Sequence, residues 1–178
     1  MFHWFRPAEV LRSFLTLLDE RPEVHVVYLT LGIERDKRIQ ELVNRLDAHE
    51  RGHVIDRFLT TDEMRLIWSI TDALVSVPVQ DGISEGILEG MYAGCIPIVS
   101  DLASNRSFLE DGVSGVFVRG DADSARDLAA TFESVVDDLP ELKSRMVERN
   151  RRWVSDEASV ESTAIEVVKM VQQLAERK

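Results

Sequence analysis

The chain has 178 residues, of which 44% are hydrophobic and 30% are charged, the composition of a soluble globular protein. Its net charge of −11 argues against a basic surface for nucleic acid, and no apolar run reaches the roughly 20 residues of a membrane helix. One cysteine excludes an internal disulfide or a cysteine-based metal cluster, and the four histidines show no metal-ligand spacing. The start lacks a signal-peptide pattern, so we expect a cytoplasmic protein.

Helix-like and strand-like segments alternate along almost the whole chain. Apolar residues recur at helical spacing in some segments, while short runs rich in β-branched residues end at turn residues. The predicted helices are 7–21, 34–50, 60–70, 84–92, 105–110, 123–138, 140–154 and 159–177. The predicted strands are 24–32, 53–59, 73–79, 96–101 and 116–119.

The segment ALVSVPV (73–79) is apolar at nearly every position, which indicates a strand buried on both faces of a parallel sheet. Repeated strand-helix units of this kind predict an α/β fold with a doubly wound, Rossmann-like parallel sheet flanked by helices, followed by C-terminal helices. We expect residues 1–178 to form a single domain. Ligands of such sheets bind beyond the carboxyl ends of the strands, so the turn after Val79 is a candidate site.

That turn contains Asp81 and Gly82, and Ser84 stands at the N-cap position of the next helix. The first free backbone N–H groups, near Glu85 and Gly86, point outward and together with the helix dipole favour an anion. The alternative is an ordinary strand-to-helix turn.

Glu89 lies among apolar residues in the same predicted helix, so its carboxylate needs a partner. Two ribose hydroxyls could donate to it; the alternative is a solvated helix face. Four glycines at positions 82, 86, 90 and 94 predict close packing of this helix against the sheet. They do not form a Gly-x-Gly-x-x-Gly fingerprint, and the chain has no Walker sequence. Cys95 and Trp68 are predicted to be packing residues.

The segment DGISEGILEGMYAGCIPIVSDLASNRSFLEDGVSGVFV (81–118) resembles the C-terminal, donor-binding domain of GT-B glycosyltransferases, above all the group-1 family of retaining enzymes. Asp81 and Glu89 have the offset of the family's Glu-x7-Glu motif. AGCIPIVSD matches its Gly-x-Pro-Val segment, and EDGVSGVFV matches its later Asp-Gly-x-x-Gly turn. The resemblance extends over nearly the whole chain.

The resemblance implies a role for each residue of the turn and helix. The implied catalytic residues are Asp81 and Glu89, and the implied donor-binding residues are Arg6, Gly82, Ser84, Glu85, Gly86, Ile87, Leu88 and Glu89. Asp81 would face the transferred sugar, and Glu89 would accept hydrogen bonds from the ribose. Backbone N–H groups at the helix start would bind the diphosphate, with the two apolar residues after them under the nucleoside. Arg6 stands where the family has a phosphate-binding lysine.

Two positions depart from the family pattern. Asp81 is one methylene shorter than the usual glutamate, and Ser84 stands where the family often has glycine. The family places an arginine and a lysine near the first strand to neutralise the diphosphate, and of these two positions only that of Arg6 is visible here. This incomplete cation pair and Asp81 motivate an alternative, a non-catalytic α/β interaction module that kept the fold and lost the site. Half of a related sugar-nucleotide epimerase is a further alternative.

The implied function is binding of a UDP- or GDP-linked sugar for transfer of a hexose-type sugar to an acceptor, with retention. The resemblance implies no metal and no other cofactor, and it places the enzyme in polysaccharide or glycolipid biosynthesis. It also implies an N-terminal acceptor domain that this chain does not include. We therefore expect the chain alone to be inactive, and we expect any peripheral membrane contact to come through the full-length protein.

Overall fold

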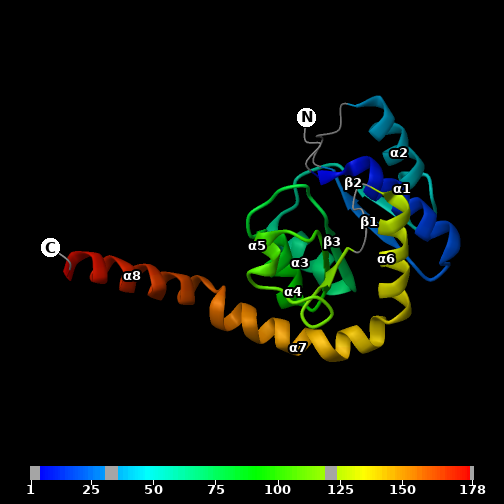
Figure 1. The fold of residues 1–178 in the computed structure, drawn as a ribbon. Coiled ribbons are helices and arrows are strands. Elements are labelled where there is room, and N and C mark those ends of the chain that lie inside the picture. The colour runs from blue at the N-terminus through cyan, green and yellow to red at the C-terminus, as the bar shows by residue number, and fades with distance from the viewer. Residues whose placement is uncertain (1–4, 31–35, 119–123, 177–178) are drawn as a thin grey trace.

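The computed structural model describes residues 5–30, 36–118 and 124–176, and its elements follow the predicted order (Figure 1). The helices are α1 (Pro7–Glu20), α2 (Lys37–Asp47), α3 (Thr61–Ile70), α4 (Glu85–Ala93), α5 (Ala103–Arg106), α6 (Ala125–Asp137), α7 (Leu139–Glu157) and α8 (Val160–Glu176). The strands are β1 (Val26–Leu29), β2 (Gly52–Ile55), β3 (Ala73–Ser76), β4 (Ile96–Val99) and β5 (Val116–Phe117).

The strands are shorter than the sequence predicts. β2 ends at Ile55, β3 at Ser76 and β4 at Val99, because a strand ends where its neighbour leaves the hydrogen-bonded ladder rather than where its own apolar run stops. Helix α5 covers Ala103–Arg106 instead of residues 105–110. The predicted ends at residues 32, 34, 119, 123 and 177 fall outside the described residues.

All described strand pairs are parallel. β1 pairs with β2, with Val26 opposite Gly52, and β4 lies between β3 and β5, with Ala73 opposite Ile96. Successive strands are joined by helices, as parallel pairing requires. The predicted Rossmann-like α/β class with C-terminal helices is therefore confirmed.

β4 is buried along its whole length. Ile96 and Ile98 pack against apolar side chains of α1, α6 and α7, whereas Val99 on the opposite face packs against those of α4. Helices therefore cover both faces of this strand, as a parallel sheet of this class needs. At roughly 25 cal/mol per Å² of apolar surface, such burial is the main source of stability at the centre of the fold.

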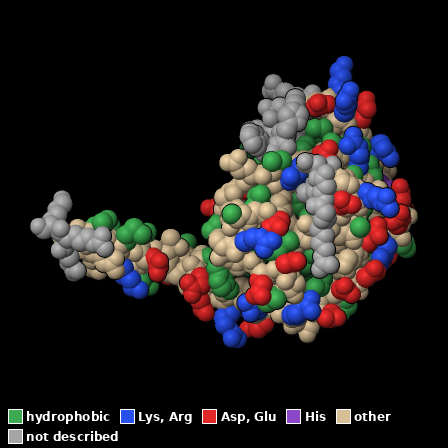
Figure 2. Space-filling view, viewed as in Figure 1, with side chains coloured by type: hydrophobic (Ala, Val, Ile, Leu, Met, Phe, Trp, Pro, Cys, Tyr) green, Lys and Arg blue, Asp and Glu red, His purple; other side chains and the backbone are tan. Residues whose placement is uncertain are grey.

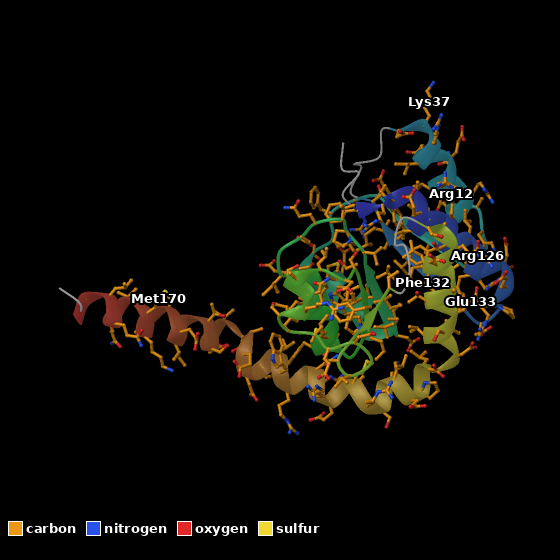
Figure 3. The ribbon with its side chains drawn as sticks, viewed as in Figure 1. Arg12, Lys37, Arg126, Phe132, Glu133 and Met170 are labelled. Carbon is orange, nitrogen blue, oxygen red and sulfur yellow. The ribbon has the colours of Figure 1, made fainter. Side chains whose placement is uncertain are left out.

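Helices α1 and α6 lie side by side on one face (Figure 1), where the rings of Phe14 and Phe132 stack with centroids 5.3 Å apart. Figure 3 labels Phe132 on α6. Apolar side chains of α1 also pack with those of α2, β1 and β2 in a second cluster that includes Leu18 and Leu46. Helix α1 thus links the two sheets.

Helix α7 packs along α4, and Arg151 on α7 donates to the carbonyl oxygens of Tyr92 (3.0 Å) and Ala93 (2.8 Å) at the end of α4. Helix α8 then extends away from the body (Figure 1). Its described side chains are exposed apart from Ser162, and hydrophobic side chains such as Met170, 61% exposed, lie along it (Figures 2 and 3). No helix in the described ranges is both long and apolar enough to cross a bilayer.

Arg51 fixes the end of α1. Its guanidinium donates to the carbonyl oxygens of Leu18 (2.6 Å), Arg21 (2.6 Å) and Val24 (3.0 Å), which belong to the last turn of α1 and the segment leading to β1. The side chain is only 16% exposed, so these carbonyl groups receive little water. A cation placed there gives the carbonyl of Leu18, in the last turn of α1, a donor outside the helix and also suits the helix dipole.

We predict that Arg51→Ala lowers the free energy of unfolding by about 2–4 kcal/mol, because three shielded carbonyl groups lose a charged donor. Chemical denaturation followed by far-UV circular dichroism measures the change. Arg152→Ala is the matched control, since Arg152 is 73% exposed and pairs with the exposed Glu148, and we expect it to cost less than about 1 kcal/mol. Equal losses in the two variants would contradict the anchoring role of Arg51.

Candidate functional site

The carboxyl ends of β3 and β4 are held together by polar contacts. Ser100, directly after β4, donates its hydroxyl to the carbonyl oxygen of Pro78 (2.7 Å) and accepts the Asn105 side-chain amide at its own carbonyl (2.9 Å). Arg6 donates to the carbonyl oxygen of Val77 (2.8 Å) and to the Ser100 hydroxyl (3.4 Å). These contacts bring Arg6, distant in sequence, to the start of the β3–α4 loop.

The backbone of Arg6 is left-handed, with φ 47° and ψ 47°, at the N-cap of α1. This conformation costs a residue with a side chain about 1–2 kcal/mol. The hydrogen bonds to Val77 and Ser100 hold the residue in place against that cost. Strained residues occur at functional sites more often than elsewhere, and this one places a guanidinium at the carboxyl edge of the sheet.

Asp81 lies in the β3–α4 loop and is exposed. Its carboxylate accepts the backbone N–H of Gly82 (2.8 Å), and its carbonyl oxygen accepts the Ser104 hydroxyl from α5 (2.9 Å). The loop is therefore tied to α5 on one side and, through Val77, to Arg6 on the other. These contacts leave the exposed carboxylate of Asp81 beyond the carboxyl ends of the strands.

The first turn of α4 follows this loop. Ser84 occupies the N-cap position as predicted, but its side chain makes no capping hydrogen bond, and the helix begins with bonds from the N–H groups of Ile87 (3.1 Å) and Leu88 (3.3 Å) to its carbonyl oxygen. The N–H groups of Glu85 and Gly86 form no hydrogen bond to any residue that the structure describes. Unpaired N–H groups at a helix start carry partial positive charge and favour an anion.

The two apolar residues of this turn point mainly inward. Ile87 is 2% exposed and packs in the cluster with Leu74 and Met91, and Leu88 is half-buried against the same cluster. The Ile87 side chain therefore anchors α4 to the sheet, and a ligand at the open edge would meet only its backbone. Leu88 retains partial exposure.

Glu89 lies two turns along α4 and is exposed. Its Oε2 atom accepts the indole N–H of Trp68 on α3 at 3.2 Å. Glu89 thus lies on a solvated helix face, the alternative that the sequence left open, and its carboxylate also has a partner, a tryptophan that we expected only to pack. A carboxylate has about four lone-pair positions, so most of its accepting capacity stays open.

Two of the four glycines have a packing or conformational role. A Cβ atom at Gly90 would lie 2.1 Å from Leu74 Cδ2, so this glycine lets α4 approach β3 closely. Gly94 ends α4 in the left-handed region with φ 104°, and a Cβ there would also meet the Arg151 guanidinium at 2.8 Å. The predicted close packing of α4 against the sheet is confirmed at Gly90.

The other two glycines have neither role, so the prediction that all four pack α4 against the sheet is wrong. A Cβ at Gly82 would meet nothing within 4 Å, and one at Gly86 would meet only Ser84 Oγ at 3.7 Å. Neither has a left-handed φ, and Gly82 precedes the helix. Space for a ligand is a remaining reason to omit a side chain at these two positions.

Cys95, just before β4, and Asp101, just after it, have shifted pKa values. Burial raises the pKa of the Cys95 thiol to about 11, so the thiol stays protonated at neutral pH and behaves as the core residue predicted. Hydrogen bonds from Arg106 hold the pKa of Asp101, just after β4, below its usual range. Within the described residues, no three His, Cys, Asp or Glu side chains gather as a metal site.

The sequence did not single out Trp68, Ser100, Ser104 or Asn105 as site residues. The polar run SDLASN directly after a buried strand was the available signal for the last three, because the carboxyl ends of β3 and β4 meet at one edge. No sequence signal indicates the Trp68 contact, which depends on how α3 lies on α4.

A parallel sheet with free N–H groups of a helix start beyond the carboxyl ends of its strands is typical of nucleotide-binding α/β proteins. The family model for glycosyl transferases group 1 matches residues 3–153, and the chain therefore belongs to this family. Its fold is that of the C-terminal half of a GT-B glycosyltransferase, as the sequence resemblance predicted. No curated protein matches the chain.

Solved structures share the fold at low sequence identity. A glycosyltransferase from Rickettsia africae superposes with a TM-score of 0.79 and 15% identity, over 98% of this chain and 46% of its own. The C-terminal domain of the group 1 family protein LpcC from Francisella tularensis gives 0.73 and 15%, over 90% of this chain and 83% of its own. Anabaena Alr3699/HepE in complex with UDP-glucose gives 0.79 and 13%, over 97% and 46%. The chain thus spans less than half of the first and third of these proteins.

We predict opposite effects on stability for alanine at two glycines of α4. Gly90→Ala should lower the free energy of unfolding by about 1–3 kcal/mol, because the new methyl group overlaps Leu74. Gly86→Ala should leave stability unchanged or raise it by up to about 1 kcal/mol, because the helix gains propensity without a clash. Urea denaturation measures both. A large loss in Gly86→Ala would mean that Gly86 has a packing role after all.

Proposed function

We propose that this chain is the donor-binding part of a retaining glycosyltransferase and binds a UDP- or GDP-linked sugar at the carboxyl edge of β3 and β4. The observation that carries the proposal is that the N–H groups of Glu85 and Gly86 form no hydrogen bond to a described residue and lie in the same loop-helix unit as Asp81 and Glu89. The two glycines without a packing role, Gly82 and Gly86, support it.

The diphosphate would bind at the start of α4. Two N–H groups, the helix dipole and the guanidinium of Arg6 supply positive charge there, and the proposal needs no metal or other cofactor. During transfer the bond between the sugar C1 and the diphosphate oxygen breaks, and the electron pair leaves with the diphosphate. Preorganised donors at that position stabilise the developing negative charge.

The two carboxylates would act on either side of the diphosphate. Glu89, on the body of α4, would accept hydrogen bonds from the ribose hydroxyls with the lone pairs that Trp68 leaves open. Asp81, in the loop, would face the transferred hexose. The acceptor hydroxyl would form the new bond to C1 on the face that the diphosphate leaves and would give its proton to the departing diphosphate oxygen; attack on that face is retention.

The residues of this chain would line one side of the substrate cleft. Asp81, Gly82, Ile83, Glu85 and Glu89 are all exposed, whereas catalysis needs an enclosed cleft that positions both substrates and excludes water. Exposed apolar side chains also lie in the loop, with Val79 at 45% and Ile83 at 54%. A second domain facing this edge would complete the cleft, and the 46% coverage of the Rickettsia and Anabaena proteins is consistent with one.

The full-length protein would then transfer the sugar to a polysaccharide or glycolipid acceptor in the cytoplasm, with any membrane contact being peripheral. The isolated chain would bind donor without turnover. Binding of UDP-glucose by Anabaena HepE supports a nucleotide-sugar ligand for this fold.

We predict that the chain binds UDP or GDP and that Glu89→Ala weakens the binding about 10- to 100-fold, because a carboxylate that accepts ribose hydroxyls is lost. Isothermal titration calorimetry with each nucleotide measures the affinity. The control is Glu148→Ala, which removes an exposed helical glutamate, 79% exposed, from α7. We expect that variant to bind like the unaltered chain.

Two outcomes would contradict this assignment. Absence of binding to both nucleotides would favour the non-catalytic interaction module, and unchanged affinity in Glu89→Ala would place the nucleotide elsewhere. Thermal unfolding of each variant, followed in parallel, separates loss of the site from loss of the fold.

We further predict that Glu85→Gln strengthens UDP or GDP binding about 2- to 5-fold at low ionic strength. Glu85 is exposed in the first turn of α4, where its charge stabilises the free helix but repels a diphosphate at the same N–H groups. The gain should shrink as salt screens the repulsion. Calorimetry at two salt concentrations tests this, with Glu148→Gln as control. Weaker binding at low salt would contradict the diphosphate position.

A further inference from the structure

Trp68 connects α3 to the candidate site. Its indole Nε1 donates to Glu89 Oε2 at 3.2 Å, across the contact between α3 and α4. This is the hydrogen bond that the structure gives to the Glu89 carboxylate within the described residues. Glu85, one turn earlier on α4 and also exposed, accepts no hydrogen bond at its carboxylate from a described residue. The two glutamates of one helix thus differ in whether a neighbouring helix orients them.

Packing fixes the indole in place. Trp68 is half-buried against the apolar cluster that contains Leu74 and Met91. A Cβ atom at Gly90 would lie 3.5 Å from Trp68 Cζ3, an ordinary van der Waals distance, so the ring packs beside the residue that follows Glu89. With the ring packed there, the edge that carries the N–H is directed toward Glu89.

An oriented carboxylate binds a diol better than a freely rotating one. A glutamate side chain loses rotamer freedom when it binds, and a donor that already holds it reduces that loss. The indole uses one accepting position of the carboxylate, and the remaining positions suffice for two ribose hydroxyls. The bond to a charged acceptor is also stronger than one between neutral groups.

We propose that Trp68 is a positioning residue that holds the Glu89 carboxylate ready for the ribose of the nucleotide. This inference rests on the function proposed above, since it concerns the same site. It assigns to the tryptophan a part in recognition of the 2′- and 3′-hydroxyls that its packing alone would not give it.

The test compares nucleotides with and without the ribose hydroxyls. Calorimetry gives the affinity of the 178-residue chain for UDP and GDP, and for the 2′,3′-dideoxy form of the tighter one. Trp68→Phe, which keeps an aromatic ring but removes the N–H, should weaken the ribonucleotide about 3- to 10-fold and leave the dideoxynucleotide unchanged. Trp153→Phe is the control; Trp153 stacks on Phe108 with centroids 5.6 Å apart and should affect neither nucleotide.

Each outcome decides the proposal. An equal loss for both nucleotides in Trp68→Phe would assign Trp68 to packing alone, and no loss would remove it from the site. If Glu89→Ala still weakens the ribonucleotide in either case, the proposed function stands and this inference fails. If the unaltered chain binds no nucleotide, both fail together.

A second variant covers the case in which Trp68→Phe disturbs the fold. Replacement of Trp68 by 3-benzothienylalanine keeps the shape of the bicyclic ring and exchanges the N–H for sulfur. It should reproduce the selective loss for the ribonucleotide while thermal unfolding stays as in the unaltered chain. Full ribonucleotide affinity in that variant would overturn the positioning role.

Discussion

Burial of β4 on both faces is the constraint on which the rest of the structure depends. Its four residues face helices α1, α6 and α7 on one side and α4 on the other. A strand enclosed in this way cannot shift its register without moving its side chains to the wrong layer. The position of Ser100 at its end is therefore fixed, and the contacts of Ser100 fix Pro78, Arg6 and Asn105 in turn.

The order and type of the elements followed from the sequence because they depend on local periodicity. Apolar runs such as residues 73–79 predicted the strands. The apolar residues at helical spacing in residues 34–50 predicted the helix α2, in which Ile39, Leu42 and Leu46 are buried. The lengths of the strands did not follow, since they depend on the partner. Within the described residues, β5 covers Val116–Phe117, a shorter stretch than the apolar run around it suggests.

The candidate site was predictable only in part, for the same reason. The placement of Asp81, Ser84 and Glu89 on one loop-helix unit is local and was readable from spacing. The contact of Glu89 with Trp68 and the tie from Ser104 to the loop join segments that are distant in sequence. The uniform spacing of the glycines also concealed two different causes. A Cβ atom at Gly90 would meet Leu74, whereas one at Gly82 would meet nothing within 4 Å.

Helix α8 differs from every other long helix in where its stability comes from. Its described side chains are exposed apart from Ser162, so little apolar surface is buried to hold it helical. A helix of this length without tertiary packing is marginal in water, because nucleation is costly and propagation gains little per residue. Its helicity is therefore set by its own residues and by its junction with α7. Unfolding of α8 and unfolding of the body are energetically separate events, and the cooperative unit of this chain ends before Val160.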